Sequence, residues 1–357
     1  MSLLPPASPR FRSLEELDLA DLEAIRLLLR GGSVVDWYRL DLVDDEKIEG
    51  MLRTLEVDLR DPVDRARTEA VKNAAIAFLR RHFDFPVPRP VAEQDIAGLI
   101  KLASGPRGHR QICACTILKV VHIIHHLDAR ELLFLLPIAD EQVFHFVEKK
   151  IYRVMGSALA AGFPIVEFIG GRKNKDSLYT KLLSKKEVTA AQIYDKLRFR
   201  LVLRSPDDLF PMLAFLHEHL YPFNYVIPGQ TTNTLVHFRA YCDSKPHLAS
   251  LLPGLQEVVD KSEDGYGMLD NHFTAPTYRV VHFVVDLPVR LPDSVLAEAP
   301  PEAWTLGRVI FMQAEIQVLD QMTDQANEMG DASHDAYKDR QKLAVMRRLK
   351  VGASVKE

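Results

Sequence analysis

Apolar residues recur at the spacing of an α-helix through most of the first 160 residues. One segment ends at the pair Gly31 and Gly32, and another begins with Asp61 followed by Pro62, a typical cap and first-turn proline. Five segments are predicted to be helices: 14–30, 61–83, 92–104, 110–127 and 140–162. The pattern therefore predicts an all-helical N-terminal part.

Beyond residue 163 the pattern changes to short runs rich in β-branched and aromatic residues. Five runs are predicted to be strands: 163–170, 193–203, 233–241, 277–287 and 308–320. Two helical stretches lie between them, at 177–189 and 207–220, and the final stretch is a basic amphipathic helix. This order predicts an α+β fold with a flexible lead at 1–12, an all-α domain at 13–160, a sheet domain at 161–345 and a tail at 346–357.

The alternation within two of these runs separates an apolar face from a polar one. In 308–320, every second residue is apolar, whereas Gln313, Glu315 and Gln317 follow one another on the opposite face. In 277–287, Tyr278 and His282 share one face. A carboxylate flanked by two amides suits an open, ligand-facing surface. An ordinary solvated strand face is the competing interpretation.

Candidate magnesium and phosphate ligands come from three other places. Asp195 begins one predicted strand and Glu315 lies on another, and Mg²⁺ bound to a nucleotide prefers one or two carboxylates. The segment 172–186 is rich in Lys and Arg, with Ser177, Lys181 and Lys185 on one helix face. Such cations are suited to a triphosphate, although a basic run can also be a solvated helix face.

These fragments, in this order, resemble the synthetase domain of the RelA/SpoT (p)ppGpp synthetases. The motif Gly-Arg-x-Lys followed by Ser-Ile-Tyr-x-Lys-Leu is matched from Gly171 to Leu182, and Tyr-Asp-x-x-x-x-Arg is matched at 194–200. The Tyr-Gln-Ser-Leu-His element is met at 278–282, the Glu-Val-Gln strand at 315–317, and the Glu-x-Gly motif with its His and Tyr-Lys at 328–338. The elements span some 170 residues.

The resemblance implies a mixed-sheet nucleotidyltransferase fold flanked by helices, and the transfer of pyrophosphate from ATP to a 3′-hydroxyl. It implies that Asp195 and Glu315 hold Mg²⁺ and that Glu315 also activates the acceptor. It implies ATP-phosphate contacts by a basic set: Arg172, Lys173 or Lys175, Lys181 and Arg200, assisted by Ser177. It also implies that Tyr278 stacks on the acceptor base beside His282 and Gln317.

The acceptor half departs most from the family motifs. The family's Lys-Pro-x-Asn-Gly becomes 273–277, Phe-Thr-Ala-Pro-Thr, and its Arg-Thr after the Glu-x-Gln becomes Leu319-Asp320. The acceptor therefore stays open between GDP or GTP and an RNA 3′ end, which the basic final helix would contact. A nucleotide sensor without catalysis is the alternative from another class. The N-terminal helices are expected to regulate the enzyme or contact a protein partner.

Composition narrows the setting. The chain has 357 residues and a net charge of −4, so no global basic field indicates nucleic acid. Three cysteines form no disulfide framework, and no signal peptide or continuous apolar span is evident, so a cytoplasmic protein without a membrane partner is expected. His122, His125 and His126 with Asp128 invite a metal site, but their apolar helix favours packing histidines.

Overall fold

The computed structural model describes residues 10–32, 35, 37, 39–42, 44–184, 196–255, 274–329 and 332–353. Its N-terminal part contains seven α-helices among the described residues: α1 (Leu19–Arg30), α2 (Asp45–Thr54), α3 (Pro62–Phe83), α4 (Arg89–Ala92), α5 (Ile96–Ser104), α6 (His109–Leu135) and α7 (Asp140–Ala160). Gly31 ends α1 in the left-handed conformation. Asp61 caps α3 by accepting a hydrogen bond from the Val63 amide at 2.8 Å. The helical prediction for this part is confirmed.

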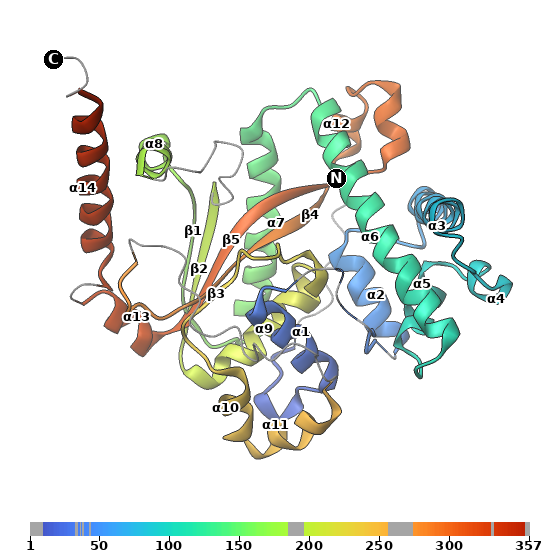
Figure 1. Ribbon diagram of the computed structural model, residues 1–357, viewed down its shortest axis with the longest axis horizontal. Coiled ribbons are helices and arrows are strands. Elements are labelled where there is room, and N and C mark those ends of the chain that lie inside the picture. The colour runs from blue at the N-terminus through green and yellow to red at the C-terminus, as the bar shows by residue number, and fades with distance from the viewer. Residues whose placement is uncertain are drawn as a thin grey trace.

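A mixed five-stranded sheet forms the centre of the molecule (Figure 1). Its strands are β1 (Ile165–Arg172), β2 (Leu197–Leu203), β3 (Thr232–Asn233), β4 (Val281–Arg290) and β5 (Val309–Asp320). The order across the sheet is β1-β2-β5-β4-β3, and only the β2–β5 pair is parallel. The α+β prediction with a mixed sheet is confirmed.

Seven further α-helices are described in the C-terminal part: α8 (Lys175–Ser184), α9 (Leu209–His219), α10 (Phe238–Asp243), α11 (Pro246–Leu251), α12 (Asp293–Leu296), α13 (Gln321–Asn327) and α14 (His334–Ala353). The prediction of a strand at 233–241 is wrong, because β3 has only two residues and α10 follows it. Phe238 and Cys242, one helical turn apart, are both buried in the core. Tertiary packing therefore favours a helix in a segment whose composition favours a strand.

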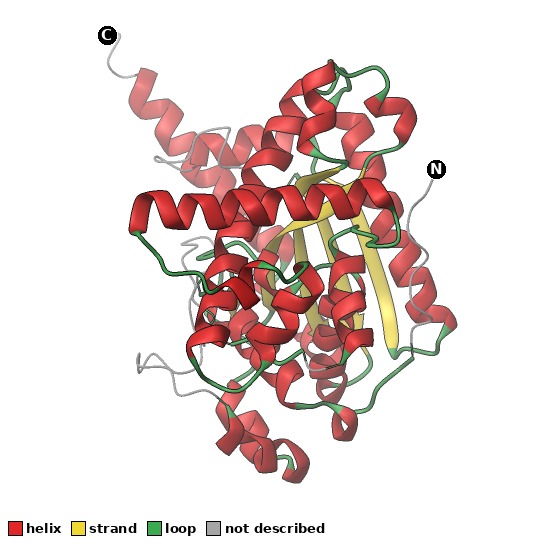
Figure 2. Ribbon diagram, turned by 90° about the vertical axis from the view of Figure 1, so that its right-hand side faces the viewer, coloured by secondary structure: helices red, strands yellow, loops and turns green. Residues whose placement is uncertain are grey.

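Two apolar cores lie side by side. The larger one joins one face of the sheet to α1, α7 and α9. The smaller one lies among α2, α3, α5 and the first half of α6. Figure 2, seen from the side of α3–α6, shows these helices in front of the sheet. The α7 helix thus shares its core with the sheet, while the predicted domain bounds at residues 12, 160 and 345 stay predictions.

The α6 helix is long and apolar enough, by length and composition, to cross a membrane, and it is the only such helix within the described ranges. It packs against α3, α5 and β5, and 39% of its most apolar stretch is buried. Core helices of globular proteins share this length and composition.

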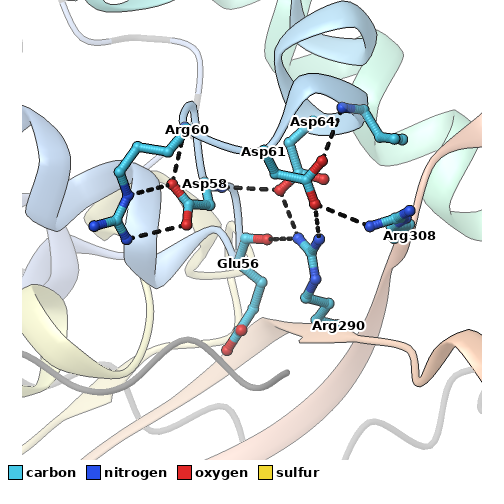
Figure 3. Close-up of polar contacts among 8 residues, drawn as sticks. Glu56, Asp58, Arg60, Asp61, Asp64, Arg290 and Arg308 are labelled. Carbon is cyan, nitrogen blue, oxygen red and sulfur yellow. Dashed lines mark hydrogen bonds and ion pairs between the residues drawn. The ribbon is translucent and has the colours of Figure 1, made fainter. Parts of the chain in front are cut away.

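A network of ion pairs connects the start of α3 to the end of β4 (Figure 3). Arg290 donates to the Asp64 carboxylate at 2.6 Å and to the Glu56 carbonyl at 2.9 Å. Asp61 accepts from Arg308 at 3.0 Å and from Arg290 at 3.3 Å. Since Arg290 and Asp64 are both buried, these paired charges fix the helical part in position against the sheet.

Candidate functional site

The polar face of the sheet is built around Glu315, in the middle of β5. Glu315 lies opposite Arg198 of β2 on one side and Val284 of β4 on the other. Gln317, two residues on, lies opposite Arg200 and His282. Residues opposite one another in a ladder project to the same face, so polar side chains from three strands gather there.

Three polar groups surround the Glu315 carboxylate. Gln317 donates from its side-chain nitrogen to Glu315 Oε1 at 2.7 Å. His282 Nε2 lies 3.5 Å from the same oxygen, and Arg198 Nε lies 3.8 Å from it. Glu315 is only 6% exposed, whereas the Arg198 side chain keeps 35% of its surface exposed. The carboxylate is therefore buried among polar groups, close to the solvent.

Gln317 has an unused hydrogen-bond acceptor. The amide is 8% exposed, and its Oε1 has no hydrogen-bond partner among the described residues. A buried amide oxygen without a partner is unfavourable, because it loses its hydrogen bonds to water. A hydroxyl group or a cation beside Glu315 would satisfy it.

The expectation of an open surface along this face of β5 is wrong. Val309 and Phe311, on the same face as Glu315, are buried together with Ala129 of α6 and Tyr225. His126 of α6 stacks on Phe311 with ring centroids 4.7 Å apart. The α6 helix covers the first half of this face, so the polar site is confined to the second half. Strand alternation shows that a face is polar but not which helix lies over it.

Arg200 and the missed residue Arg198 project from β2 beside Glu315. Arg200 forms an ion pair with Asp324 of α13, and its second guanidinium nitrogen lies 3.7 Å from Glu328. Sequence reasoning selected Arg200 but neither Arg198 nor Asp324 as site residues. Strand alternation was the available signal for Arg198, because it is two residues before Arg200. No sequence signal marked Asp324.

Tyr278 lies just before β4, not within the predicted strand, and close to the same charges. Burial raises the pKa of its hydroxyl, and the nearby guanidinium groups of Arg200 and Arg198 oppose that rise. Its backbone position is fixed from two sides. Thr234 donates to the Tyr278 carbonyl at 2.9 Å, and buried Asn327 of α13 bonds to both backbone groups of Arg279. The structure thus brings Tyr278, His282, Arg200, Gln317 and Glu315 together.

Arg172 does not join this group. It lies opposite Leu197 in the β1–β2 ladder, on the apolar face of the sheet. Its guanidinium makes two hydrogen bonds of 2.8 Å to Glu148 of α7. This bidentate pair holds Arg172 on the opposite face from Glu315.

The other predicted phosphate ligands lie at the start of α8. The Lys173 amide donates to the Lys196 carbonyl at 2.9 Å, which extends the β1–β2 pairing. Asn174 caps the helix by accepting from the Ser177 amide at 2.8 Å. Lys175 is exposed, while Ser177 and Lys181 are partly buried. The α8 helix packs against α14, on the other side of the sheet from α7 in Figure 1.

Asp195 and Lys185 lie outside the described residues. The pairing of Asp195 with Glu315 as a magnesium site therefore stays a prediction. Within the described ranges, the side chains of His, Cys, Asp and Glu form no group of three that could hold a metal ion. Glu315 and the free oxygen of Gln317 are the hard oxygen atoms that the described part of the site offers to Mg²⁺.

The three histidines of α6 lie in packing positions. His126 Nε2 lies 2.7 Å from the Asp286 carboxylate, and His125 Nδ1 lies 3.3 Å from the Tyr225 hydroxyl. His122 is buried with its ring edge against Tyr225. Asp128 pairs instead with Arg67 of α3. These contacts join α6 to the sheet.

Comparison with known proteins gives similarity in structure alone. No family profile matches the chain, and no curated protein matches it. The small alarmone synthetase 2 from Bacillus subtilis is similar with a TM-score of 0.31 and 15% identity, covering 61% of this chain and 97% of that one. The small alarmone synthetase 1 from the same organism, bound to its product pppGpp, gives 0.30 and 13%, covering 61% and 96%.

A GTP pyrophosphokinase family protein from Streptococcus pneumoniae gives a TM-score of 0.27 and 15% identity, covering 58% of this chain and 90% of that one. These solved structures carry names from the family that the sequence motifs resemble. At TM-scores of 0.31 or less, the case for a reaction has to rest on this chain's own residues.

Proposed function

We propose that this protein transfers the β,γ-pyrophosphoryl group of ATP to the 3′-hydroxyl of a nucleotide. The observation that carries the proposal is Glu315, a buried carboxylate on a polar sheet face, with Arg198 and Arg200 on the neighbouring strand. This arrangement places a base next to fixed positive charges, which is what transfer of a charged phosphoryl group requires.

Each side chain has a distinct role in this proposal. The 3′-oxygen of the acceptor attacks the β-phosphorus of ATP, and the bond from that phosphorus to the α–β bridging oxygen breaks, so AMP leaves. Glu315 takes the hydroxyl proton, and Gln317 Oε1 accepts a hydrogen bond from the same hydroxyl before the transfer. Arg198 and Arg200 stabilise the charge on the phosphate oxygens, and Tyr278 stacks on the acceptor base.

Mg²⁺ fits the oxygen chemistry of this site. Glu315, together with Asp195, would hold the ion, and bound Mg²⁺ would neutralise charge on the phosphates. Lys173, Lys175 and Lys181 of the α8 region would bind the ATP phosphates, with Ser177 assisting. Arg172 would join them only if its pair with Glu148 opened.

The direct test follows AMP and the 3′-modified product by mass spectrometry. The purified full-length chain is mixed with ATP, Mg²⁺ and either GDP or GTP. Equal amounts of AMP and product are expected, and Glu315→Gln should lower the rate by about 100-fold or more, as for loss of a general base. Glu302→Gln, an exposed carboxylate on the 3-10 helix Pro301–Leu306, is the matched control and should retain full activity.

An RNA 3′ end is the second candidate acceptor. It is favoured by α14, an exposed helix that carries Lys338, Lys342, Arg347 and Arg348 and packs against α8. With tRNA as acceptor, the double variant Lys342→Glu, Arg347→Glu should lose labelling and its salt dependence should weaken. The same variant should leave any reaction on free GDP unchanged.

Failure of these assays separates enzyme from sensor. If ATP binds but no AMP forms with GDP, GTP or tRNA, the proposed transfer is wrong, and a nucleotide-binding protein without catalysis is the remaining reading. Full activity of Glu315→Gln would instead show that another group is the base.

A further inference from the structure

A cavity lies where the helical part meets the sheet, away from Glu315. Its walls come from α2, α3, α5 and α6 on one side, and on the other from the 3-10 helix Phe223–Tyr225, the segment 306–308 and the start of β5. Its volume is about 100 Å³, counted as the space open to the centre of a water-sized sphere. One water needs roughly 10–15 Å³ on that measure, so the cavity has room for a molecule the size of an aromatic ring system.

Most of the cavity wall is hydrocarbon. The apolar side chains come from both sides of the junction, for example Leu52, Val71, Val121 and Val309. An apolar wall favours a ligand with an apolar body.

The charged groups around the cavity are paired with one another. Arg67 pairs with Asp128, Arg308 with Asp61 at 3.0 Å, and Asp64 with Arg290 at 2.6 Å. Burial lowers the pKa of His122 to about 3 and that of His125 to about 4, so both rings are neutral at pH 7. No uncompensated charge therefore remains to attract an ion.

Several buried polar atoms on the wall nevertheless lack a hydrogen-bond partner among the described residues. Trp37 is 5% exposed and its indole N–H is unpaired. Asn224 is 6% exposed, and its side-chain oxygen is unpaired although its nitrogen meets His122. The Nε atoms of Arg67 and Arg308 are also unpaired. Three donors and one acceptor thus need partners that the described part of the protein does not supply.

We infer that this cavity is a binding site for a small uncharged molecule with a flat apolar body and an amide-like group that accepts one hydrogen bond and donates another. The carbonyl of the ligand meets an N–H such as that of Trp37, and its own N–H meets the oxygen of Asn224. Because both the helical part and the sheet line the cavity, the bound molecule stabilises the junction between them. The site is independent of the transfer reaction at Glu315.

The probe for this site is 2-quinolone, an uncharged bicyclic lactam that absorbs where tryptophan emits. The chain has two tryptophans, so Trp304→Phe leaves Trp37 as the only emitter. Trp304 is 46% exposed and does not line the cavity, so the protein should remain folded. Titration should quench Trp37 emission saturably and raise the midpoint of thermal unfolding.

Two variants in the same background test the location. Val121→Phe fills the cavity and should abolish quenching, and Asn224→Leu removes the acceptor and should weaken binding by about tenfold. Thermal unfolding of each variant without probe verifies its fold. The charged analogue 2-naphthoate should bind at least tenfold more weakly than 2-quinolone.

Three outcomes would overturn the inference. Emission that does not change saturably with 2-quinolone means that the cavity holds water only. Unchanged affinity in a folded Val121→Phe protein places the probe elsewhere. Equal or tighter binding of 2-naphthoate shows that the ligand class is wrong. Each result is read without any assay of AMP formation.

Discussion

Burial controls the protonation of two histidines on α6. His122 is 8% exposed and contacts the Asn224 side chain at 3.2 Å. Burial is the main cause of its low pKa of about 3, and the neighbouring histidines lower it further. His125, beside Tyr225 and Phe311, has a pKa of about 4 for the same main reason.

Folding should therefore become less favourable in mild acid. The unfolded chain binds these protons near pH 6.5 and the folded chain only near pH 3 to 4, so the free energy of unfolding falls as the pH is lowered through that window. The loss should be roughly 2 kcal/mol per histidine between pH 7 and pH 5.

Urea denaturation at pH 7 and at pH 5 measures this loss. His122→Gln removes one titrating group, so it should reduce the difference between the two pH values by about half of the histidine contribution. An identical pH dependence in parent and variant would show that His122 is protonated alike in the folded and unfolded chains.

At the scale of single elements, β1 depends on the close approach of α7 and β2. A Cβ atom added at Gly170 would lie 2.7 Å from the Phe199 ring and 2.7 Å from the Tyr152 hydroxyl. A Cβ atom at Gly171 would meet nothing within 4 Å. Adjacent glycines on one strand thus face different surroundings, because Gly170 lies opposite Phe199 and Gly171 lies opposite Arg198.

Gly170→Ala should destabilise the protein by about 1–3 kcal/mol, since the ring of Phe199 has to move within a packed core. Gly171→Ala, the matched control, should change stability by no more than about 0.5 kcal/mol. Urea denaturation of the two variants compares them. Equal stability of both would mean that β1 does not approach α7 as closely as described.

At the scale of the whole molecule, a buried ion pair joins three distant segments. Lys150 of α7 lies 2.9 Å from the Glu56 carboxylate, and both side chains are 2% exposed. Lys150 also donates to the Pro288 carbonyl of β4 at 2.7 Å and to the Thr54 carbonyl at the end of α2 at 3.1 Å. Burial lowers the Lys150 pKa, and the Glu56 carboxylate opposes that shift.

Removing either partner alone should cost about 3–5 kcal/mol, because a buried charge remains without its counter-ion. Lys150→Met with Glu56→Gln should cost clearly less than the sum of the two single variants. The exposed pair of Arg89 and Glu93 is the control, and Arg89→Ala should cost less than about 1 kcal/mol. Additive costs for Lys150 and Glu56 in denaturation would show that the two charges do not interact.

The sequence by itself determined the local elements and the chemistry of the site. Asp61 and Pro62 set the start of α3, and the alternation in β5 put Glu315 and Gln317 on one face, because caps and strand period depend only on near neighbours. The order of the motifs indicated which polar residues to consider together, and Tyr278, His282, Arg200, Gln317 and Glu315 do meet.

Only the tertiary structure decided what covers these faces and which charges pair. It placed α6 over the first half of the Glu315 face, turned Arg172 to Glu148 on the other face, and made a helix of 238–243. It also formed the cavity between Trp37 and Asn224. These features depend on contacts between segments far apart in the chain, and local periodicity carries no information about such contacts.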